Sequence, residues 1–232
     1  RTMISLSWSL TRQAHGEQPM WAGIVLAAML GQIGLPGGGI GIGYSAVNRV
    51  GYDLNRISFA SVPQGINAVK EFIPVARIAD MLLQPGSPFD YNGGRFSYPD
   101  IQLIYWAGGN PFHHHQDLAR LIRAWQKPQT VISHEWCWNA LAHHSDIVLP
   151  VTTPVERRDI AMTPLDPYLV SMEPAIEPVG QARDDYDIFT ALSELMGVED
   201  AFTEGRTSED WQRWLYEVCL LYTSDAADDM QC

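Results

Sequence analysis

Short apolar segments alternate with helical segments between residues 101 and 150, and this alternation constrains the fold more than any other feature of the chain. The segments 101–106, 130–133 and 146–150 have the length and composition of buried strands. Residues 117–125 carry apolar side chains at helical spacing, and residues 136–143 can form a second short helix. Strands that alternate with helices at this spacing predict βαβ units. We therefore expect an α/β fold in which a parallel sheet is flanked by helices in Rossmann-like units.

This architecture predicts where a ligand binds. Open parallel sheets bind ligands outside the carboxyl ends of their strands. In this chain those ends are residues 107–116, 134–135 and 151–158, and they are rich in polar residues or glycine. We therefore expect a nucleotide-like ligand at this edge of the sheet.

The longest apolar run spans residues 21–33 and is too short to cross a bilayer, so it predicts a buried helix. The glycine-rich stretch GLPGGGIGIG follows at 34–43 and is either a structural loop or a phosphate loop. The dinucleotide-binding fingerprint G-x-G-x-x-G does not match this stretch, because Ile42 occupies the position of its last glycine. This mismatch favours a structural loop. Residues 44–100 are expected to be irregular, with a short helix at 69–82 and a turn at 91–94.

The run His113-His114-His115 suggests a metal site, but consecutive side chains point in different directions. We favour an interpretation in which the run opens the helix that follows the first strand. One imidazole would then face a ligand, and Asp117 would stabilise the start of that helix.

Other polar groups allow several interpretations. His143, Ser145 and Asp146 resemble a hydrolase triad, but no G-x-S-x-G nucleophile motif is present. The acidic cluster at residues 184–187 has four interpretations. It is a solvated surface at a helix start, a pair of catalytic carboxylates, a site for a hard metal ion, or the source of a carboxylate that accepts hydrogen bonds from two N–H groups of guanine. The arginine pair at 157–158 forms either a surface salt bridge or a phosphate clamp.

Charge and cysteine content exclude several classes of function. The chain carries 15 Lys+Arg against 27 Asp+Glu, a net charge of −12, which argues against non-specific binding to nucleic acid or an anionic membrane. The three cysteines form no CxxC pair, so neither a zinc site nor a disulfide framework is indicated. Cys137, between two tryptophans, is expected to be a buried thiol.

Four long motifs resemble one enzyme family. They are SWSLTRQAHGEQP at 7–19, AAMLGQIGLPGGG at 27–39, YPDIQLIYWAGGNPFHHHQDL at 98–118 and HSDIVLPVTTPVERRDI at 144–160. They resemble the bis-molybdopterin guanine dinucleotide oxidoreductases, in particular the dimethyl sulfoxide, trimethylamine N-oxide and biotin sulfoxide reductases. The resemblance extends from Arg1 to about Tyr216.

The resemblance implies that nine residues bind the cofactor: Trp8, Ser9, Arg12, Asn110, His114, His134, Glu135, Arg157 and Asp185. The first three match positions that line one of the two cofactors. Asn110 and His114 match the loop that holds the nucleotide part, and His134 and Glu135 match the strand end that approaches the guanosine. Arg157 matches a cofactor-contacting arginine, and Asp185 matches the carboxylate that reads the guanine.

The resemblance also implies an activity. The full-length enzyme would use a molybdenum bis-molybdopterin guanine dinucleotide cofactor to transfer oxygen from biotin sulfoxide, methionine sulfoxide, dimethyl sulfoxide or trimethylamine N-oxide. Its partners would be that small molecule and an electron donor protein or reductant. We expect no nucleic acid, no membrane span, a monomer, and a location in either the cytoplasm or the periplasm. A nicotinamide-dependent dehydrogenase and a non-catalytic cofactor-binding fragment are the alternatives.

Family members are several times longer than this chain, and their molybdenum-ligating serine has no counterpart here. The chain therefore resembles the middle of a larger multidomain molybdoenzyme, and we expect it to lack reductase activity by itself. We predict a helical or irregular segment with the glycine-rich loop at 1–97 and a dinucleotide-contacting α/β segment at 98–216. The tail at 217–232 is expected to be poorly packed and is either appended non-native sequence or an ordinary acidic tail.

Overall fold

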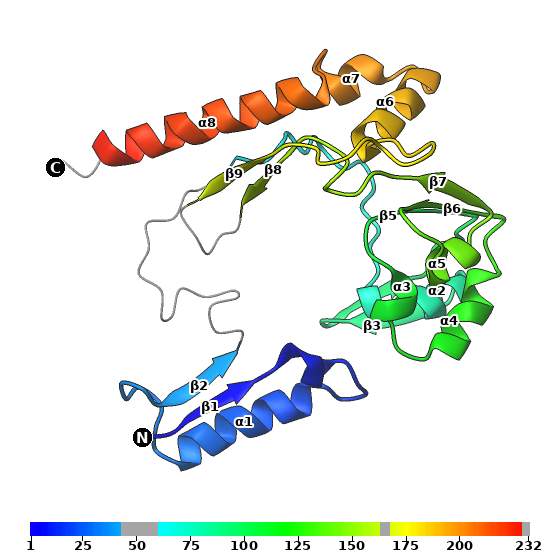
Figure 1. Ribbon diagram of the computed structural model, residues 1–232. Helices are drawn as coiled ribbons and strands as arrows, with labels where there is room; N and C mark the ends of the chain where they lie inside the picture. Colours follow the sequence, from blue (N-terminus) through cyan, green and yellow to red (C-terminus); the bar gives the residue numbers. More distant parts are fainter. Residues whose placement is uncertain (43–59, 163–167, 229–232) are drawn as a thin grey trace. The chain divides into compact units, whose positions relative to one another are not determined.

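The computed structural model describes residues 1–42, 60–162 and 168–228, with side chains described up to residue 218 (Figure 1). The chain divides into two compact units. The first comprises Arg1–Ile57 and Met162–Tyr168, and the second comprises Ser58–Ala161 and Leu169–Cys232. The division of the sequence into segments 1–97, 98–216 and 217–232 stays a prediction.

In the first unit, β1 (Met3–Leu6) pairs in parallel with β2 (Gly39–Ile42), and α1 (Glu17–Met29) packs against them. A short 3-10 helix, η1 (Trp8–Thr11), follows β1. The helix predicted at 21–33 is thus confirmed, although it begins and ends earlier.

The prediction that this helix is buried is wrong. Trp21 is 63% exposed and Met29 is 79% exposed, and only Gly23 and Ala27 are buried along the described helix. The physical reason is that a two-stranded sheet covers only one side of a helix. Gly23 lies on that side, where an added Cβ would come within 2.5 Å of Leu6 Cδ1.

The glycine-rich stretch joins α1 to β2. Gly37 has a φ of 74°, and a Cβ at Gly38 would lie 2.7 Å from the Gln32 carbonyl oxygen. A side chain is therefore disfavoured at both positions, which supports the structural interpretation of this loop. Gly43, the last glycine of the stretch, lies outside the described residues.

The second unit contains the predicted parallel sheet. Its strands β5 (Leu103–Ala107), β6 (Thr130–Glu135) and β7 (Ile147–Pro150) are all parallel, in the order β5-β6-β7. The connecting helices are α4 (Leu118–Trp125) and α5 (Ala140–His143). The α/β fold with a parallel sheet and flanking helices is confirmed.

The core of this unit lies between β6 and several helices. It consists of seven buried apolar residues: Leu82, Phe112, Leu121, Ala124, Trp125, Val131 and Leu141. Each large side chain of this kind contributes about 1.5–3 kcal/mol when fully buried. The core therefore holds the sheet rigid beneath the loops at its carboxyl edge.

Two elements that precede the sheet differ from expectation. The helix predicted at 69–82 is shorter, with η2 (Val75–Arg77) leading into α2 (Ile78–Leu83), which packs on α4. A hairpin of β3 (Pro88–Tyr91) and β4 (Gly94–Ser97) follows. Its turn is the one predicted at 91–94, where Asn92 and Gly93 both adopt positive φ.

The histidine run does not open α4, the helix predicted at 117–125, so that part of the prediction is wrong, whereas the prediction that Asp117 stabilises the start of α4 is confirmed. Residues of the run form a separate one-turn helix, α3 (Pro111–His114), whose N-cap is Asn110. Asp117 then caps α4 through its own side chain and adopts a left-handed φ of 49°. That reversal of the backbone separates the two helices.

The C-terminal part begins with the strand pair β8 (Asp159–Met162) and β9 (Leu169–Met172). Three helices follow: α6 (Asp185–Leu195), α7 (Glu199–Thr203) and α8 (Ser208–Asp228). No helix in the described part of the chain is long and apolar enough to cross a membrane.

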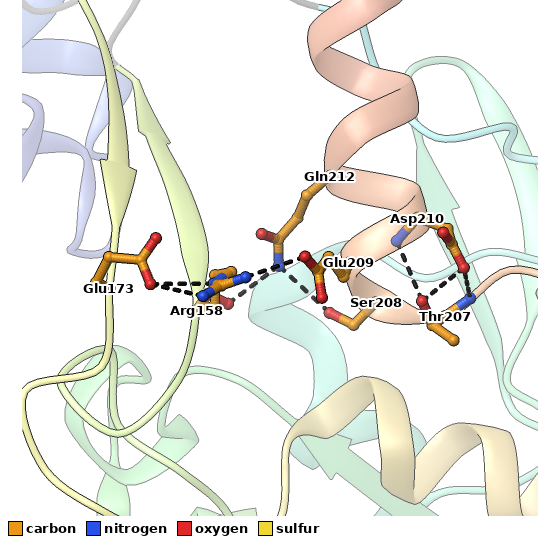
Figure 2. Close-up of polar contacts among 7 residues, drawn as sticks. All are labelled: Arg158, Glu173, Thr207, Ser208, Glu209, Asp210 and Gln212. Atoms are coloured by element: carbon orange, nitrogen blue, oxygen red, sulfur yellow. Dashed lines mark hydrogen bonds and ion pairs between the residues drawn. The ribbon is translucent and has the colours of Figure 1, made fainter.

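Arg158 connects the strand pair to α8 (Figure 2). Its guanidinium lies 2.8 Å from Glu173 and 3.0 Å from Glu209, and Gln212 donates to its carbonyl at 3.0 Å. This agrees with the salt-bridge interpretation of Arg158. The α8 backbone is helical to Asp228, while the packing of Leu220 and Leu221 and residues 229–232 lie outside the description.

Candidate functional site

A pocket of about 490 Å³ opens at the carboxyl ends of the parallel strands. We call it the strand-end pocket. It is lined by Gly108, Gly109, Asn110, His113, His114, His134, Glu135, Trp136, Cys137, Asn139, Val151 and Asp185. The structure thus brings together residues from all three predicted strand ends and from the start of α6.

Asn110 leaves one polar group free in this pocket. Its Oδ1 accepts a hydrogen bond from the Phe112 backbone N–H at 3.0 Å, which fixes the side chain as the N-cap of α3. Its buried Nδ2 has no hydrogen-bond partner among the described residues. An unsatisfied buried donor costs about 1–3 kcal/mol, so the position favours a ligand or water acceptor.

Glu135 leaves a second free group. Its Oε2 accepts a hydrogen bond from Asn139 Nδ2 at 2.6 Å, whereas its buried Oε1 has no partner in the described part of the chain. Burial raises the pKa of this carboxyl, and the hydrogen bond from Asn139 opposes part of that shift. The pocket therefore holds a buried donor and a buried carboxyl oxygen, and neither has a partner among the residues that the structure describes.

Asp185 adds a carboxylate that solvent can reach. One of its oxygens lies 2.6 Å from His134 Nδ1, and the His134 Nε2 atom lies 2.7 Å from the Tyr105 hydroxyl. The His134 side chain is 1% exposed, while that of Asp185 is 49% exposed. The imidazole is therefore enclosed, and the carboxylate faces the pocket.

The strand register explains how these side chains meet. Ala107 pairs with His134, so Tyr105, two residues earlier on β5, lies on the same face of the sheet as His134. The isolated bridge between Val151 and Arg183 brings the start of α6 beside the end of β7. Asp185, in the first turn of α6, thereby reaches the sheet edge.

Arg157 is held by the protein instead of lining the pocket. Its Nη1 donates to the Thr152 carbonyl at 2.9 Å, and its Nε lies 3.1 Å from Asp159. In the same loop, Glu156 accepts hydrogen bonds from Thr153 and from the Val179 backbone N–H at 2.7 Å. These bonds lower the pKa of Glu156 and fix the loop after β7.

The family model described as molybdopterin oxidoreductase matches residues 1–195. The chain belongs to the molybdopterin oxidoreductase family. That membership favours a molybdopterin enzyme over a nicotinamide-dependent dehydrogenase.

Several molybdopterin oxidoreductases are similar to this chain. A biotin sulfoxide reductase from Cereibacter sphaeroides is 51% identical over 94% of this chain and 29% of its own length. A dimethyl sulfoxide/trimethylamine N-oxide reductase of the same organism is 43% identical over 95% of this chain and 28% of its own. A trimethylamine-N-oxide reductase from Haemophilus influenzae is 44% identical over the same shares. The chain therefore spans less than a third of each of these relatives.

A solved structure gives a partial match only. Acetylene hydratase from Pelobacter acetylenicus matches with a TM-score of 0.41 and 20% identity, over 50% of this chain and 18% of that protein. This likeness is too small to add to the assignment.

The molybdopterin family implies a cofactor, and the strand-end pocket fits part of one. Asn110 Nδ2 and Glu135 Oε1 are buried groups without partners in the described residues, and both belong to this pocket. The described residues contain no group of three His, Cys, Asp or Glu side chains that could hold a metal ion. The two buried groups of the pocket that lack partners in the described residues suit a polar organic ligand.

The remaining residues that the resemblance implies to bind the cofactor lie in two parts of the chain. His114 lines the strand-end pocket together with His113. Trp8 and Ser9 are in η1, and Arg12 is its C-cap, so these three lie together in the first unit. The pocket contains five of the nine residues that the resemblance implies.

Trp136, Cys137 and Asn139 line the strand-end pocket without having been predicted to bind. Their position in the sequence could have predicted this, because they follow His134 and Glu135 directly after the carboxyl end of β6. The prediction that Cys137 is buried is wrong: it is exposed, because Trp136 and Trp138 are themselves 68% and 72% exposed and do not cover it.

Proposed function

We propose that this chain is the part of a molybdenum-dependent sulfoxide or N-oxide reductase that binds the guanosine end of a bis-molybdopterin guanine dinucleotide cofactor. The observation that carries the proposal is the strand-end pocket. There, two buried polar groups without a partner among the described residues line the same pocket as the half-exposed Asp185 carboxylate. Substrates of the whole enzyme would be biotin sulfoxide, methionine sulfoxide, dimethyl sulfoxide or trimethylamine N-oxide. An electron donor would supply the reducing equivalents, and the enzyme would be a monomer.

Each pocket residue has a chemical role in this proposal. A carboxylate is only an acceptor, so Asp185 suits the two adjacent N–H groups on the guanine edge and disfavours adenine, which presents an acceptor there. The Nδ2 of Asn110 donates to an oxygen of the nucleotide, and His114 and Glu135 bind the same part. Trp136 offers an exposed indole for stacking.

Residues outside the pocket support the same function. Arg157 braces the loop after β7 through Thr152 and Asp159, and its resemblance to a cofactor-contacting arginine supports a role in cofactor retention. Trp8, Ser9 and Arg12 would contact a cofactor from the first unit.

The molybdenum supplies the redox chemistry of oxygen transfer, and the protein supplies binding and orientation. The chain's own residues fix the nucleotide by hydrogen bonds and charge. By itself the chain would bind nucleotide without reducing sulfoxides.

The test is cofactor retention in the intact reductase. Asn110→Asp and Arg157→Ala are each introduced, and molybdenum and guanine nucleotide are quantified per polypeptide. Asn110→Asp places a carboxylate where the proposal requires a donor, and Arg157→Ala removes a cation, a kind of loss that typically costs about 2–5 kcal/mol in a buried charged contact. Both variants should therefore retain less cofactor than the parent. Full retention of both molybdenum and guanine nucleotide in both variants would contradict the proposal.

A further inference from the structure

The protein engages both ring nitrogens of His134, a residue of the strand-end pocket. Nδ1 lies 2.6 Å from Asp185 and Nε2 lies 2.7 Å from the Tyr105 hydroxyl. Its side chain is also almost fully buried. A ligand in the pocket therefore finds no free ring nitrogen on this residue.

The hydrogen bonds define where the imidazole proton lies. Asp185 accepts and does not donate as a carboxylate, so the proton between the two groups belongs to Nδ1. In a neutral imidazole Nε2 is then an acceptor, and Tyr105 donates its hydroxyl proton to it. Burial and the charge of Asp185 raise the pKa of Tyr105, which keeps that hydroxyl protonated.

Aromatic packing fixes the imidazole ring as well. The ring of Phe189, on α6, lies 5.0 Å from that of His134 and 5.6 Å from that of Tyr105, and the rings of His134 and Tyr105 are 5.3 Å apart. The three rings come from α6, β6 and β5, respectively. Rotation of the imidazole would therefore disturb packing between the sheet and α6.

We propose that His134 is a positioning residue: with Tyr105 setting its tautomer, it orients the Asp185 carboxylate for guanine, and it does not bind the nucleotide itself. This inference rests on the proposed function of the strand-end pocket. A carboxylate has about four lone-pair sites, so the bond to His134 leaves acceptor capacity on both oxygens. Preorganising this carboxylate reduces the ordering that binding requires.

The first test is spectroscopic and uses the 232-residue chain without ligand. The chain is labelled with ¹⁵N-histidine, and the ring nitrogens are observed by NMR. We expect a proton on His134 Nδ1 that exchanges slowly and is lost in Asp185→Ala. Tyr105→Phe removes the donor to Nε2 and should therefore increase the share of the tautomer that carries its proton on Nε2 instead of Nδ1. An unprotonated Nδ1 in the parent chain would overturn the inference.

The second test separates positioning from structural support. Affinities for guanosine diphosphate and inosine diphosphate are measured by calorimetry for His134→Leu, His134→Asn and Phe189→Leu. His134→Leu should lower guanosine diphosphate affinity about tenfold or more and reduce the preference over inosine diphosphate. His134→Asn, which keeps a donor near the Nδ1 position, should restore most of that preference. Phe189→Leu alters only the packing and should lower both affinities by a similar factor.

The outcomes distinguish this inference from the function on which it rests. If the parent chain prefers guanosine diphosphate and His134→Leu keeps the full preference, the positioning role is wrong while the guanine site stands. If the parent chain shows no preference for guanosine over adenosine diphosphate, the proposed function is wrong. The NMR result then still decides whether His134 donates to Asp185. Tyr105→Phe is the milder variant and serves both tests if His134→Leu does not fold.

Discussion

The Nδ1 atom of His134 lies 2.6 Å from a carboxylate oxygen of Asp185, a residue 51 positions later in the chain. This bond joins the carboxyl end of the central strand β6 to the first turn of α6. It places an acidic group at the sheet edge where the strand ends also contribute an amide and a carboxyl oxygen that have no partner in the described part of the chain.

Two substitutions of Asn110 should distinguish its role in ligand binding from its role in stability. Asn110→Asp keeps an oxygen that caps α3 but replaces the free amide donor with an acceptor, so nucleotide affinity should fall while the melting temperature stays close to that of the parent. Asn110→Ala loses the cap too and should cost about 0.5–2 kcal/mol of stability. Thermal unfolding and calorimetric titration measure the two effects. Equal nucleotide affinity in the parent and Asn110→Asp would show that the amide has no ligand role.

Trp136 should contribute to nucleotide binding, and Trp138 provides a matched control. Both indoles are exposed on the loop after β6, but only Trp136 lines the strand-end pocket. Stacking of a base on an aromatic side chain contributes about 1–3 kcal/mol, so Trp136→Ala should weaken nucleotide binding by roughly tenfold or more. Trp138→Ala should leave it unchanged. The interpretation fails if both variants lose affinity equally in a titration.

Glu135 should make stability fall as the pH rises. Its folded-state pKa is raised above the ordinary value of 4.5, mainly by burial. Its contribution to stability is therefore fully present below that value and is lost as the pH rises through the raised pKa. The difference in unfolding free energy between the parent and Glu135→Gln, measured by urea denaturation across this range, should show that decline. A difference independent of pH would contradict it.

Glu156 should have the opposite pH dependence. Hydrogen bonds from the Thr153 side chain, the Thr153 backbone and the Val179 backbone lower its pKa below the ordinary value of 4.5. Its contribution to stability is present above that value and is lost as the pH falls through the lowered pKa. Glu156→Gln should lower the melting temperature near neutral pH and should lose less stability on acidification than the parent. Identical acid-side loss in the two chains would exclude this role.

Much of the sheet followed from sequence because its strands are local apolar segments. β5, β6 and β7 each lie in an apolar run that can be recognised by itself, although only β6 contains buried residues. Their parallel order then placed the site at their carboxyl ends. The strands of the β3–β4 hairpin escaped prediction. Each strand has only four residues and mixes aromatic with polar side chains, although the Asn92-Gly93 turn between them was evident.

The contacts that complete the site depend on tertiary structure. The bond between His134 and Asp185 requires the bridge between Val151 and Arg183, which no local pattern encodes. The orientation of Arg157 toward Thr152 and Asp159 is likewise a product of loop folding. Apolar composition identified α1 as a helix but not its exposure, because exposure depends on what packs against it.

The central claim is that the strand-end pocket reads guanine through Asp185. Its most direct test is calorimetric titration of the chain and of Asp185→Asn with guanosine, inosine and adenosine diphosphates. The account predicts tightest binding of guanosine diphosphate. Inosine diphosphate, which lacks one N–H donor group, should bind about tenfold or more weakly, adenosine diphosphate weaker still, and Asp185→Asn should lose these differences. Equal affinity of the parent chain for guanosine and adenosine diphosphates, or no binding of guanosine diphosphate, would contradict it.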